Sequence, residues 1–366
     1  MARASSLRRL LIAAALALSA GGPAVAVSPA SAATGGTAAA PAWTAADAPG
    51  CGATAQVLAP TTSANPADPA LSPARRSLLA QIKKSGVRMQ TSASCRDGRQ
   101  GHPAPPRTPV AAKPGTAEPG TAEPGAVASP DTASTSYSAN WSGFENHDGV
   151  NYTEATMAWT VPTANSPGPA ELHSSIWPGI GSGDSSSSAL IQDGTDQNAF
   201  CNTAGCTRDY DFWYEVYPAE SSKVVSGLSV HAGDKVQTSV IYDPSNHSVL
   251  FFFVNATTQK GLSITQSVSG LGDKVDQSQV EWIAERPSIS GQYTALTDFG
   301  TMTFSQVQYM DSSYSDWVPG GYSGSQEQIT MQNCGFSQNL AVPYGWTSDL
   351  LTFYDVWVRT GKWESC

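Results

Sequence analysis

From residue 137 onward the chain consists of short runs of β-branched and aromatic residues separated by turn residues, and this pattern constrains the fold most. Seven runs have this character: Thr156–Val161, Tyr210–Tyr217, Lys235–Tyr242, Val249–Val254, Val280–Ala284, Gly300–Phe304 and Phe353–Val358. The intervening stretches are rich in Gly, Ser, Asp and Asn, and no long 3.6-residue period interrupts them. The pattern predicts an all-β sandwich or barrel, and a region of this size favours two large packed sheets.

The beginning of the chain has the features of a secretory signal in residues 1–32. A basic head with Arg3, Arg8 and Arg9 precedes the apolar run Leu10–Ala20 and a small-residue cleavage site at residues 30–32. The apolar run is too short to cross a bilayer as a helix, and no later run is long enough. We therefore expect a secreted, extracellular protein that does not span a membrane.

Residues 33–136 are predicted to be a propeptide that ends in a linker. One helix is expected at residues 73–85, with Leu78, Leu79 and Ile82 on one face. Residues 101–136 are rich in Pro, Ala and Thr and carry a tandem Gly-Thr-Ala-Glu-Pro repeat. Such a composition cannot build a core and predicts an extended linker, which is either a cleavable pro-linker or a stalk without a processing role. Residues 137–366 form the predicted β domain.

Charge is distributed unevenly between these parts. Residues 1–133 carry twelve Lys and Arg against six Asp and Glu, whereas residues 134–366 carry eight against twenty-four. A basic leader on an acidic body indicates a pro-segment that is held partly by charge. The acidic body also argues against nucleic acid as a partner and favours a protein that tolerates acid.

Six cysteines in an exported chain favour disulfides over metal ligands. The pairs suggested by position are Cys201 with Cys206, Cys334 with Cys366, and Cys51 with Cys95. Six cysteines allow fifteen pairings, so these three are hypotheses.

Several kinds of chemistry lack their motifs. The sequence contains no Gly-rich phosphate loop and no His-Glu-x-x-His zinc motif. The histidines of the β domain lie in polar, turn-like contexts, and none lies beside a Gly-x-Ser-x-Gly motif. We therefore expect no metal and no cofactor, which leaves carboxylate and amide chemistry.

Glu281 is the most informative acid in the chain. It lies within the predicted strand 280–284, where alternation puts Glu281, Ile283 and Glu285 on one face. A carboxylate on so apolar a strand costs free energy when it is buried, unless hydrogen bonds or a function compensate.

An ordered set of motifs surrounds this strand. They are Asn-Trp-Ser-Gly at 140–143, Trp-Thr-Val-Pro at 159–162, Trp-Pro-Gly-Ile at 177–180, Ile-Gln-Asp-Gly at 191–194, Trp-Tyr-Glu-Val-Tyr-Pro at 213–218, Gly-Asp at 233–234, Glu-Trp-Ile at 281–283 and Asp-Phe-Gly-Thr-Met-Thr-Phe at 298–304. In this order the set resembles the glutamic peptidase (eqolisin) family of secreted acid endopeptidases. The resemblance covers residues 137 to about 305 and leaves the last 60 or so residues without a recognised motif.

The resemblance implies a fold and a catalytic pair. Family members are β-sandwiches of two large, curved antiparallel sheets of the concanavalin-like or jelly-roll-like kind. The catalytic Gln corresponds to Gln192 and the catalytic Glu to Glu281. An ionised Glu281 would take a proton from the attacking water and return it to the leaving amine. Gln192 cannot ionise, so its amide would donate to the tetrahedral oxyanion at any pH.

Three further residues are candidates near this pair. Glu215 would orient Gln192 or the water, or would be a strand-face acid without a role. Trp177 and Trp213 would form walls of a peptide cleft, or pack in the core. Asp193, followed by Gly194, is expected to lie in a turn.

The chain also departs from the family pattern. Ile180 is followed by Gly-Ser where the family has Asp-Gly, and Val216 replaces a second Trp. After Glu-Trp-Ile the family continues Val-Glu-Asp-Phe, whereas this chain has Ala284-Glu-Arg-Pro287. These changes predict altered substrate preference with the chemistry retained.

Two alternatives remain open. A glycoside hydrolase on a similar sandwich would use Glu215 and Glu281 as its carboxylate pair. A non-catalytic carbohydrate-binding module would leave Glu281 dispensable. The peptidase interpretation predicts polypeptide substrates, the protein's own propeptide as inhibitor, no nucleic-acid or membrane partner, and a monomer.

Overall fold

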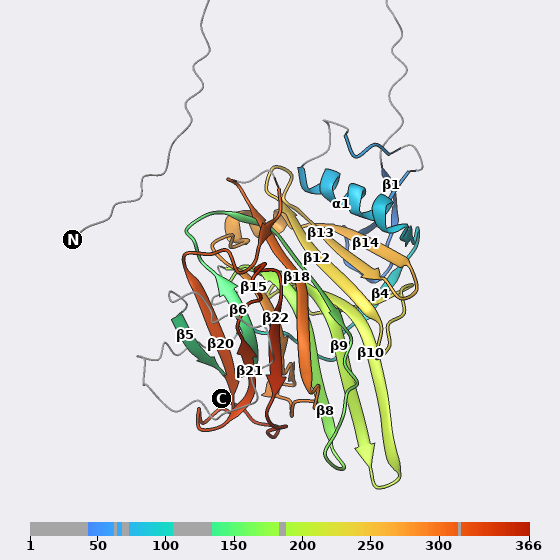
Figure 1. Cartoon of the computed structure of the whole chain (residues 1–366). Helices are drawn as coiled ribbons and strands as arrows, with labels where there is room; N and C mark the ends of the chain where they lie inside the picture. Colours follow the sequence, from blue (N-terminus) through green and yellow to red (C-terminus); the bar gives the residue numbers. More distant parts are fainter. Residues whose placement is uncertain (1–42, 62–63, 68–72, 105–133, 183–187, 314–315) are drawn as a thin grey trace, which may run out of the picture. The chain divides into compact units, whose positions relative to one another are not determined.

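The structure is a computed structural model that describes residues 43–61, 64–67, 73–104, 134–182, 188–313 and 316–366 (Figure 1). The expected signal segment and residues 105–133 of the expected linker lie outside the described residues. The described part of the chain contains no helix long and apolar enough to cross a membrane. It is almost entirely β-structure, as the alternation of residues predicts.

One antiparallel sheet, called sheet A, has the strand order β1–β2–β14–β13–β12–β7–β18–β19, and β3 pairs with β14 in parallel. Its strands are β1 (Trp43–Asp47), β2 (Gln56–Pro60), β3 (Arg88–Met89), β7 (Tyr152–Thr160), β12 (Lys235–Asp243), β13 (Ser248–Asn255), β14 (Lys260–Ser267), β18 (Thr301–Asp311) and β19 (Val318–Pro319).

The other sheet, sheet B, has the order β4–β11–β10–β9–β8–β15–β6–β20–β21–β22, and β5 pairs with β20 in parallel. Its strands are β4 (Ser94–Asp97), β5 (Ser134–Ser138), β6 (Trp141–Asn146), β8 (Glu171–Ile180), β9 (Leu190–Asn202), β10 (Gly205–Tyr217), β11 (Lys223–Ser226), β15 (Val280–Glu285), β20 (Gln326–Gln332), β21 (Asn339–Tyr344) and β22 (Phe353–Trp357). Strand β18 also pairs with β22 and so joins the two sheets.

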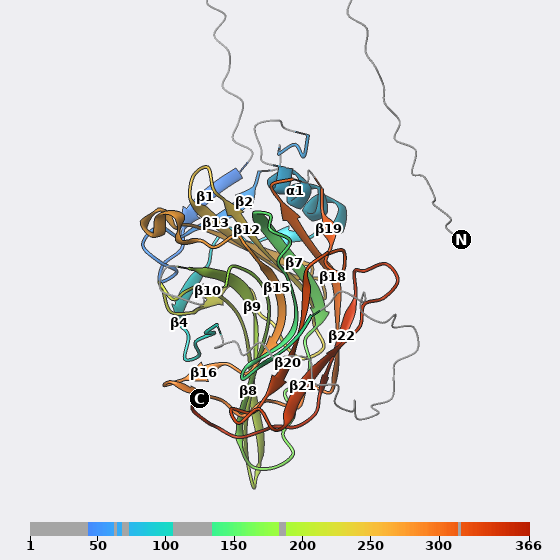
Figure 2. The same ribbon diagram turned by 90° about the vertical axis from the view of Figure 1, so that its left-hand side faces the viewer.

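The two sheets pack face to face through one large apolar core. Phe212 of β10 lies 5.5 Å from Phe253 of β13, and Tyr214 of β10 stacks on Phe251 at 4.4 Å, measured between ring centroids. The same core contains Trp282 from β15. Because strand residues alternate between faces, the residues next to these in sequence point to the outer face of sheet B. Figure 2 shows that this sheet is strongly curved.

The described leader residues extend both sheets. Strands β1 and β2 join sheet A through β14, whereas β4 joins the edge of sheet B through β11. Helix α1 (Pro73–Ser85) covers the outer face of sheet A, where Leu78 and Ile82 contact a cluster from β12 and β13 (Figure 1). The Cys51–Cys95 disulfide ties the two attachments together.

Most local predictions are confirmed. Each of the seven predicted runs lies in a strand or extends at most one residue beyond it, and the helix has the predicted bounds. All three suggested disulfides are present: Cys51–Cys95, Cys201–Cys206 and Cys334–Cys366. Outside the two sheets lie a short hairpin of β16 (Ser288–Ile289) and β17 (Gln292–Tyr293) and a 3-10 helix at Ser269–Lys274.

Two local predictions are wrong. Asp193 and Gly194 do not form a turn, because both lie inside the long strand β9. Gly194 is required there by a close approach: a Cβ would lie 2.1 Å from the backbone oxygen of Ile176. The first residues of the predicted linker, Gly101–Ala104, are also not an extended tether. They lie against sheet B, where the His102 backbone oxygen accepts a hydrogen bond from Gln192. Gly101 also exchanges two backbone hydrogen bonds, both of 2.8 Å, with Ser288 of the hairpin outside the two sheets.

Candidate active site

The outer face of sheet B carries a polar row across its central strands. In register, Glu281 of β15 lies opposite Gly179 of β8, Gly179 opposite Gln192 of β9, and Gln192 opposite Glu215 of β10. Gln192, Glu215 and Glu281 are all buried. Gly179 leaves the middle of the row without a side chain, and the ring of Trp177 takes up that space, 2.8 Å from where a Cβ would be.

Residues 98–104 of the leader cross this face through contacts with several of its strands and loops. Gly98 N–H donates to the backbone oxygen of Ser222 at 2.8 Å, and the Ser222 hydroxyl donates to the Gln100 oxygen at 2.6 Å. Gln100 Nε2 donates to Asn198 Oδ1 at 2.5 Å. His102, two residues after Gln100, is fully buried. The leader therefore occupies the face on which the site residues lie.

Gln192 contacts this segment at its backbone. Its Nε2 donates to the backbone oxygen of His102 at 2.9 Å and to Glu215 Oε2 at 3.1 Å. Glu215 Oε2 also accepts the His102 backbone N–H at 3.1 Å. The Gln192 amide thus donates to a peptide carbonyl, which is the bond an oxyanion donor must make.

Glu285 lies on the other side of His102. Its Oε2 accepts Trp177 Nε1 at 2.7 Å and lies 3.2 Å from His102 Nδ1. Its Oε1 accepts Asn140 Nδ2 at 3.0 Å, and the same Nδ2 donates to the Pro103 oxygen at 3.0 Å. Trp177 and Asn140 therefore hold a carboxyl group beside the peptide that Gln192 binds.

Glu281 lies four residues before Glu285 on strand β15, and because strand side chains alternate, both point to the same face. Its Oε1 accepts a hydrogen bond from Gln279 Nε2 at 2.7 Å. The structure thus gathers Gln192, Glu215, Trp177 and Trp213 around the leader, and it places Glu285 there as well.

The two predicted tryptophans have separate tasks. Trp213 stacks on the His102 ring with centroids 3.6 Å apart and an interplanar angle of 8°. Trp177 orients Glu285 through its indole N–H. Both belong to an apolar cluster with Trp141, Leu190 and Ile283 on the outer face of sheet B. Both tryptophans therefore pack in this cluster, and their role as walls of a peptide cleft stays a prediction.

Burial controls the protonation of the acids in this site. It raises the pKa of Glu285 well above its usual value, although the hydrogen bonds from Trp177 and Asn140 oppose the shift. It raises the pKa of Glu215 and of Asp196 to about 7 in each case, with the nearby His102 opposing. Burial also lowers the pKa of His102, opposed by Asp196 and Glu215. With the leader in place, the site favours neutral forms of its groups.

Sequence reasoning missed Glu285, Asn140, Asp196 and His102 as site residues. A period of two puts Glu281 and Glu285 on the same face, so the pattern alone could not choose between them. Asn140 lies in the Asn-Trp-Ser-Gly motif, which did carry a signal. His102 lies in a stretch whose composition predicts a linker.

Among the described residues, Glu145, His147 and Glu327 form a cluster whose side-chain atoms lie close enough together to hold a metal ion. His147 Nε2 lies 2.8 Å from Glu145 Oε1 and 3.4 Å from Glu327 Oε2. These histidine–carboxylate contacts account for the proximity of the three groups without an ion.

Comparison with known proteins identifies the family. Residues 139–338 match the model of the peptidase A4 family. The chain belongs to the peptidase A4 family. The matched region contains Asn140, Gln192, Glu215 and Glu285, and the match confirms the resemblance to the glutamic peptidases seen in the motifs.

Individual relatives agree with this assignment. Aspergillopepsin-2 of Aspergillus niger is 32% identical over 196 residues, which are 48% of this chain and 66% of the relative. The chain therefore spans just under two thirds of that relative's length. Among solved structures, scytalidoglutamic peptidase with a peptide-based transition state analogue is 19% identical, with a TM-score of 0.47 over 60% of this chain and 98% of the other. SCP-B, an eqolisin in complex with the tripeptide Ala-Ile-His, is 19% identical to this chain, with a TM-score of 0.46. The similarity again covers 60% of this chain and 98% of the other.

Proposed function

We propose that the protein is a secreted acid endopeptidase in which Gln192 and Glu285 hydrolyse peptide bonds. The observation that carries this proposal is the carbonyl of His102, which accepts the Gln192 amide at 2.9 Å while Glu285 lies beside the same residue. A peptide in this position has an oxyanion donor on its carbonyl and a carboxyl group close enough to act on water. Membership of the peptidase A4 family supports polypeptides as the substrate class.

The reaction divides between the two residues. Glu285, ionised, removes a proton from water, and the water oxygen attacks the carbonyl carbon. Gln192 donates to the oxygen that becomes negative, and as a neutral amide it does so at any pH. Glu285 then returns the proton to the leaving nitrogen as the carbon–nitrogen bond breaks. Trp177 and Asn140 fix the carboxyl group for both steps.

Acid pH suits this arrangement. Burial under the leader raises the pKa of Glu285 well above its usual value, and release of the leader brings water to this carboxyl group. A solvated Glu has a pKa of about 4.3, so the base is then ionised well below neutrality. Glu215 and Asp196, with pKa values raised to about 7 by burial in the covered site, are protonated in acid. Above pH 7 both acids ionise close to Glu285, and their mutual repulsion disfavours the arrangement. Activity is therefore expected to rise in acid and to disappear toward neutrality.

The role of the base goes to Glu285 in preference to Glu281, the residue that the sequence pattern suggested. Glu285 is the carboxyl group that contacts His102, whose carbonyl Gln192 binds. Glu281 remains useful as a matched control, because it is an equally buried Glu on the same strand and face.

The leader acts as an inhibitor in this proposal. It follows the path of a substrate, with the His102 carbonyl on Gln192, and its imidazole takes the position next to Glu285 from which a water would be activated. The residue after His102 is Pro103, so the leaving nitrogen would be a tertiary amide locked in a ring. The expected attraction between the basic leader and the acidic body is represented by an ion pair of 2.8 Å between Arg96 and Asp211. Because both groups are partly exposed, the pair contributes little.

The family assignment and the Gln192–carbonyl contact favour a peptidase over the glycoside hydrolase and the binding module. Three disulfides among the described residues fit an oxidising, extracellular compartment.

The test is hydrolysis of acid-denatured haemoglobin between pH 2 and 7 by the protein after acid activation. We expect acid-optimal hydrolysis that Glu285→Gln lowers by about 10²–10⁴-fold. Glu281→Gln should retain most of it. If activity survives Glu285→Gln and is lost in Glu281→Gln, the general base is Glu281 and not Glu285. No proteolysis by the parent protein, with cleavage of a glycan, would refute the proposal.

A further inference from the structure

The short strand β11, residues 223–226, forms the edge of sheet B next to the site, and leader strand β4 covers it. The register is antiparallel and pairs Lys223 with Asp97, Val224 with Arg96, Val225 with Cys95, and Ser226 with Ser94. Within the described residues, β11 has β10 as its other neighbour. Removal of the leader would therefore leave the backbone groups of this edge without partners, and such an edge accepts an extended peptide as an added strand.

The β11 edge and the proposed catalytic residues bind one continuous stretch of the leader. After β4, Gly98 N–H donates to the Ser222 oxygen, Gly101 pairs with Ser288, and the His102 carbonyl accepts Gln192 Nε2. Residues 94–97 lie eight to five positions before His102. A polypeptide with its reacting carbonyl on Gln192 can therefore reach the β11 edge with residues on the acyl side of that carbonyl.

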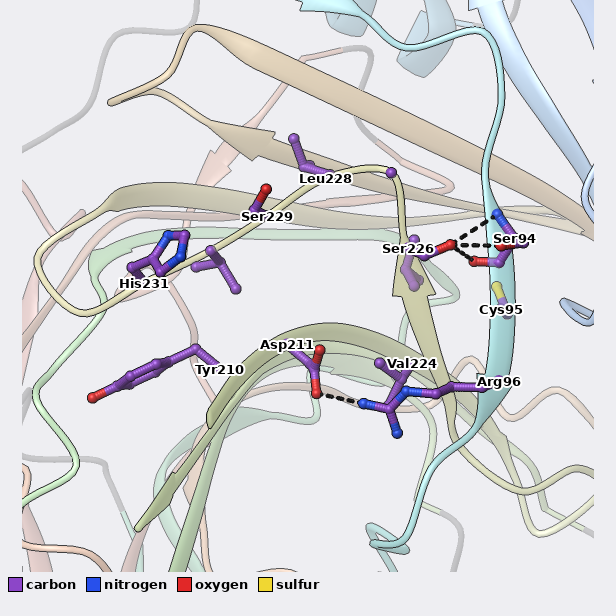
Figure 3. A pocket seen from close by; sticks show the side chains of 13 residues that line it. Ser94, Cys95, Arg96, Tyr210, Asp211, Val224, Ser226, Leu228, Ser229 and His231 are labelled. Atoms are coloured by element: carbon purple, nitrogen blue, oxygen red, sulfur yellow. Dashed lines mark hydrogen bonds and ion pairs between the residues drawn. The ribbon is translucent and has the colours of Figure 1, made fainter. Parts of the chain in front are cut away.

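Side chains at this edge distinguish one extended peptide from another. Arg96, six positions before His102, makes an ion pair of 2.8 Å with Asp211 of β10 (Figure 3). Asp97 makes one of 2.5 Å with Lys223. Ser94 also exchanges hydrogen bonds with the Ser226 hydroxyl.

A cavity lies beneath the bound strand. It has a volume of about 400 Å³ and is lined by β4, by Tyr210 and Asp211 of β10, and by residues 224–231 (Figure 3). The space leaves room for side chains larger than those of Ser94 and Cys95. The edge thus offers backbone pairing, a paired charge of each sign, and space for bulkier residues.

We infer that in the activated protein the β11 edge binds the acyl-side extension of polypeptide substrates as an antiparallel strand, five to eight residues before the reacting carbonyl. A basic side chain six positions before that carbonyl faces Asp211, and an acidic one five positions before it faces Lys223. This inference rests on the proposed function, because the position of the reacting carbonyl comes from Gln192. It assigns the enzyme a preference for long, unfolded chains over short peptides.

The experiment starts from the intact folded chain, whose linker is cut at a specific protease site placed within residues 105–133. Two fluorescent peptides share one cleavable core, and only one carries a nine-residue acyl-side extension with Arg and Asp at the two charged positions. Binding is followed by anisotropy in the Glu285→Gln background, which needs no turnover. Hydrolysis is followed separately with Glu285 intact.

We expect the extension to lower both Kd and KM by about tenfold, since each added backbone hydrogen bond contributes modestly. N-methylation four positions before the reacting carbonyl, where Gly98 N–H bonds Ser222, should remove most of this gain. Asp211→Asn should remove the advantage of Arg over Gln in the extended peptide, whereas Asp316→Asn, at an exposed acid elsewhere, should keep it.

Equal Kd and equal KM for the two peptides would overturn the inference. In that case, hydrolysis of the short peptide would still support the proposed peptidase function. Tighter binding of the extended peptide without hydrolysis of either would support the binding edge and refute the peptidase.

Discussion

Replacement of His102 by Ala tests whether the leader holds the protein inactive. His102 is the leader side chain that reaches deepest into the site: it is fully buried, stacks on Trp213 and contacts Glu285. Its backbone contacts with Gln192 and Glu215 do not depend on the side chain. The substitution therefore removes the imidazole and leaves the path of the segment intact.

The expected magnitude follows from these two contacts. A well-formed aromatic stack contributes about 0.5–1.5 kcal/mol beyond area burial. A hydrogen bond between neutral groups contributes about 0.5–1.5 kcal/mol. Together they give about 2 kcal/mol, which shifts the ratio of docked to released leader by about thirtyfold.

The assay is the initial rate at which uncut, full-length protein hydrolyses a short fluorogenic peptide near pH 5, with intact mass checked before and after. While the released form is a minority, the rate rises in proportion to the population of that form, so His102→Ala should be about thirtyfold more active than the parent. His247→Asn, at a partly buried histidine in a turn after β12, is the matched control. An unchanged rate for His102→Ala, with normal activity after activation, would refute the inhibitory role of His102.

Three further predictions follow from individual residues. Pro103→Ala should allow self-cleavage after His102, visible as a new N-terminus at position 103, because the leaving nitrogen is then an ordinary amide; a chain that stays intact there at acid pH would contradict the substrate-like register. Arg286→Met should destabilise the fold by about 3 kcal/mol, since it removes the buried guanidinium that lies 2.8 Å from the partly buried Glu364 carboxylate; thermal unfolding measures this, with the exposed Arg359→Met as control. The melting temperature of the parent should fall from pH 5 to pH 8. Burial raises the pKa of Glu154 to about 8 and that of Asp355 to about 7 in the folded protein. The stability that these protonated acids allow at low pH is therefore lost as the pH rises through their folded-state pKa values. Glu154→Gln should reduce that fall, and a melting temperature that rises with pH would refute this assignment.

The strands and the disulfides could be predicted from the sequence because both depend on local signals. The alternation in Tyr210–Tyr217 and Val280–Ala284 reports which residues face the core, and the structure puts Phe212, Tyr214 and Trp282 there. Gln192 was found through its motif, since an amide in Ile-Gln-Asp-Gly is part of an ordered set of motifs.

The choice of acid could not be made in the same way. Glu281 and Glu285 share one face of one strand, and only the three-dimensional arrangement shows that Asn140 and Trp177 converge on Glu285. Nor could composition reveal the role of Gly101–Ala104, which have no core of their own and are ordered by contacts with distant residues of sheet B. The turn predicted at Asp193 and Gly194 was wrong for a related reason. An Asp-Gly pair is typical of turns, but here the glycine lies inside a strand because the backbone of Ile176 approaches it closely.

The most direct measurement of the central claim is a double-mutant cycle on kcat for a defined peptide, with Gln192→Ala, Glu285→Gln and the double variant of the activated protein. If the two residues act on the same bond as a unit, each single substitution lowers kcat by about 10²–10⁴-fold, and the double variant is no slower than the slower single variant. Losses that multiply independently, or a Glu285→Gln variant with the kcat of the parent, would contradict the account.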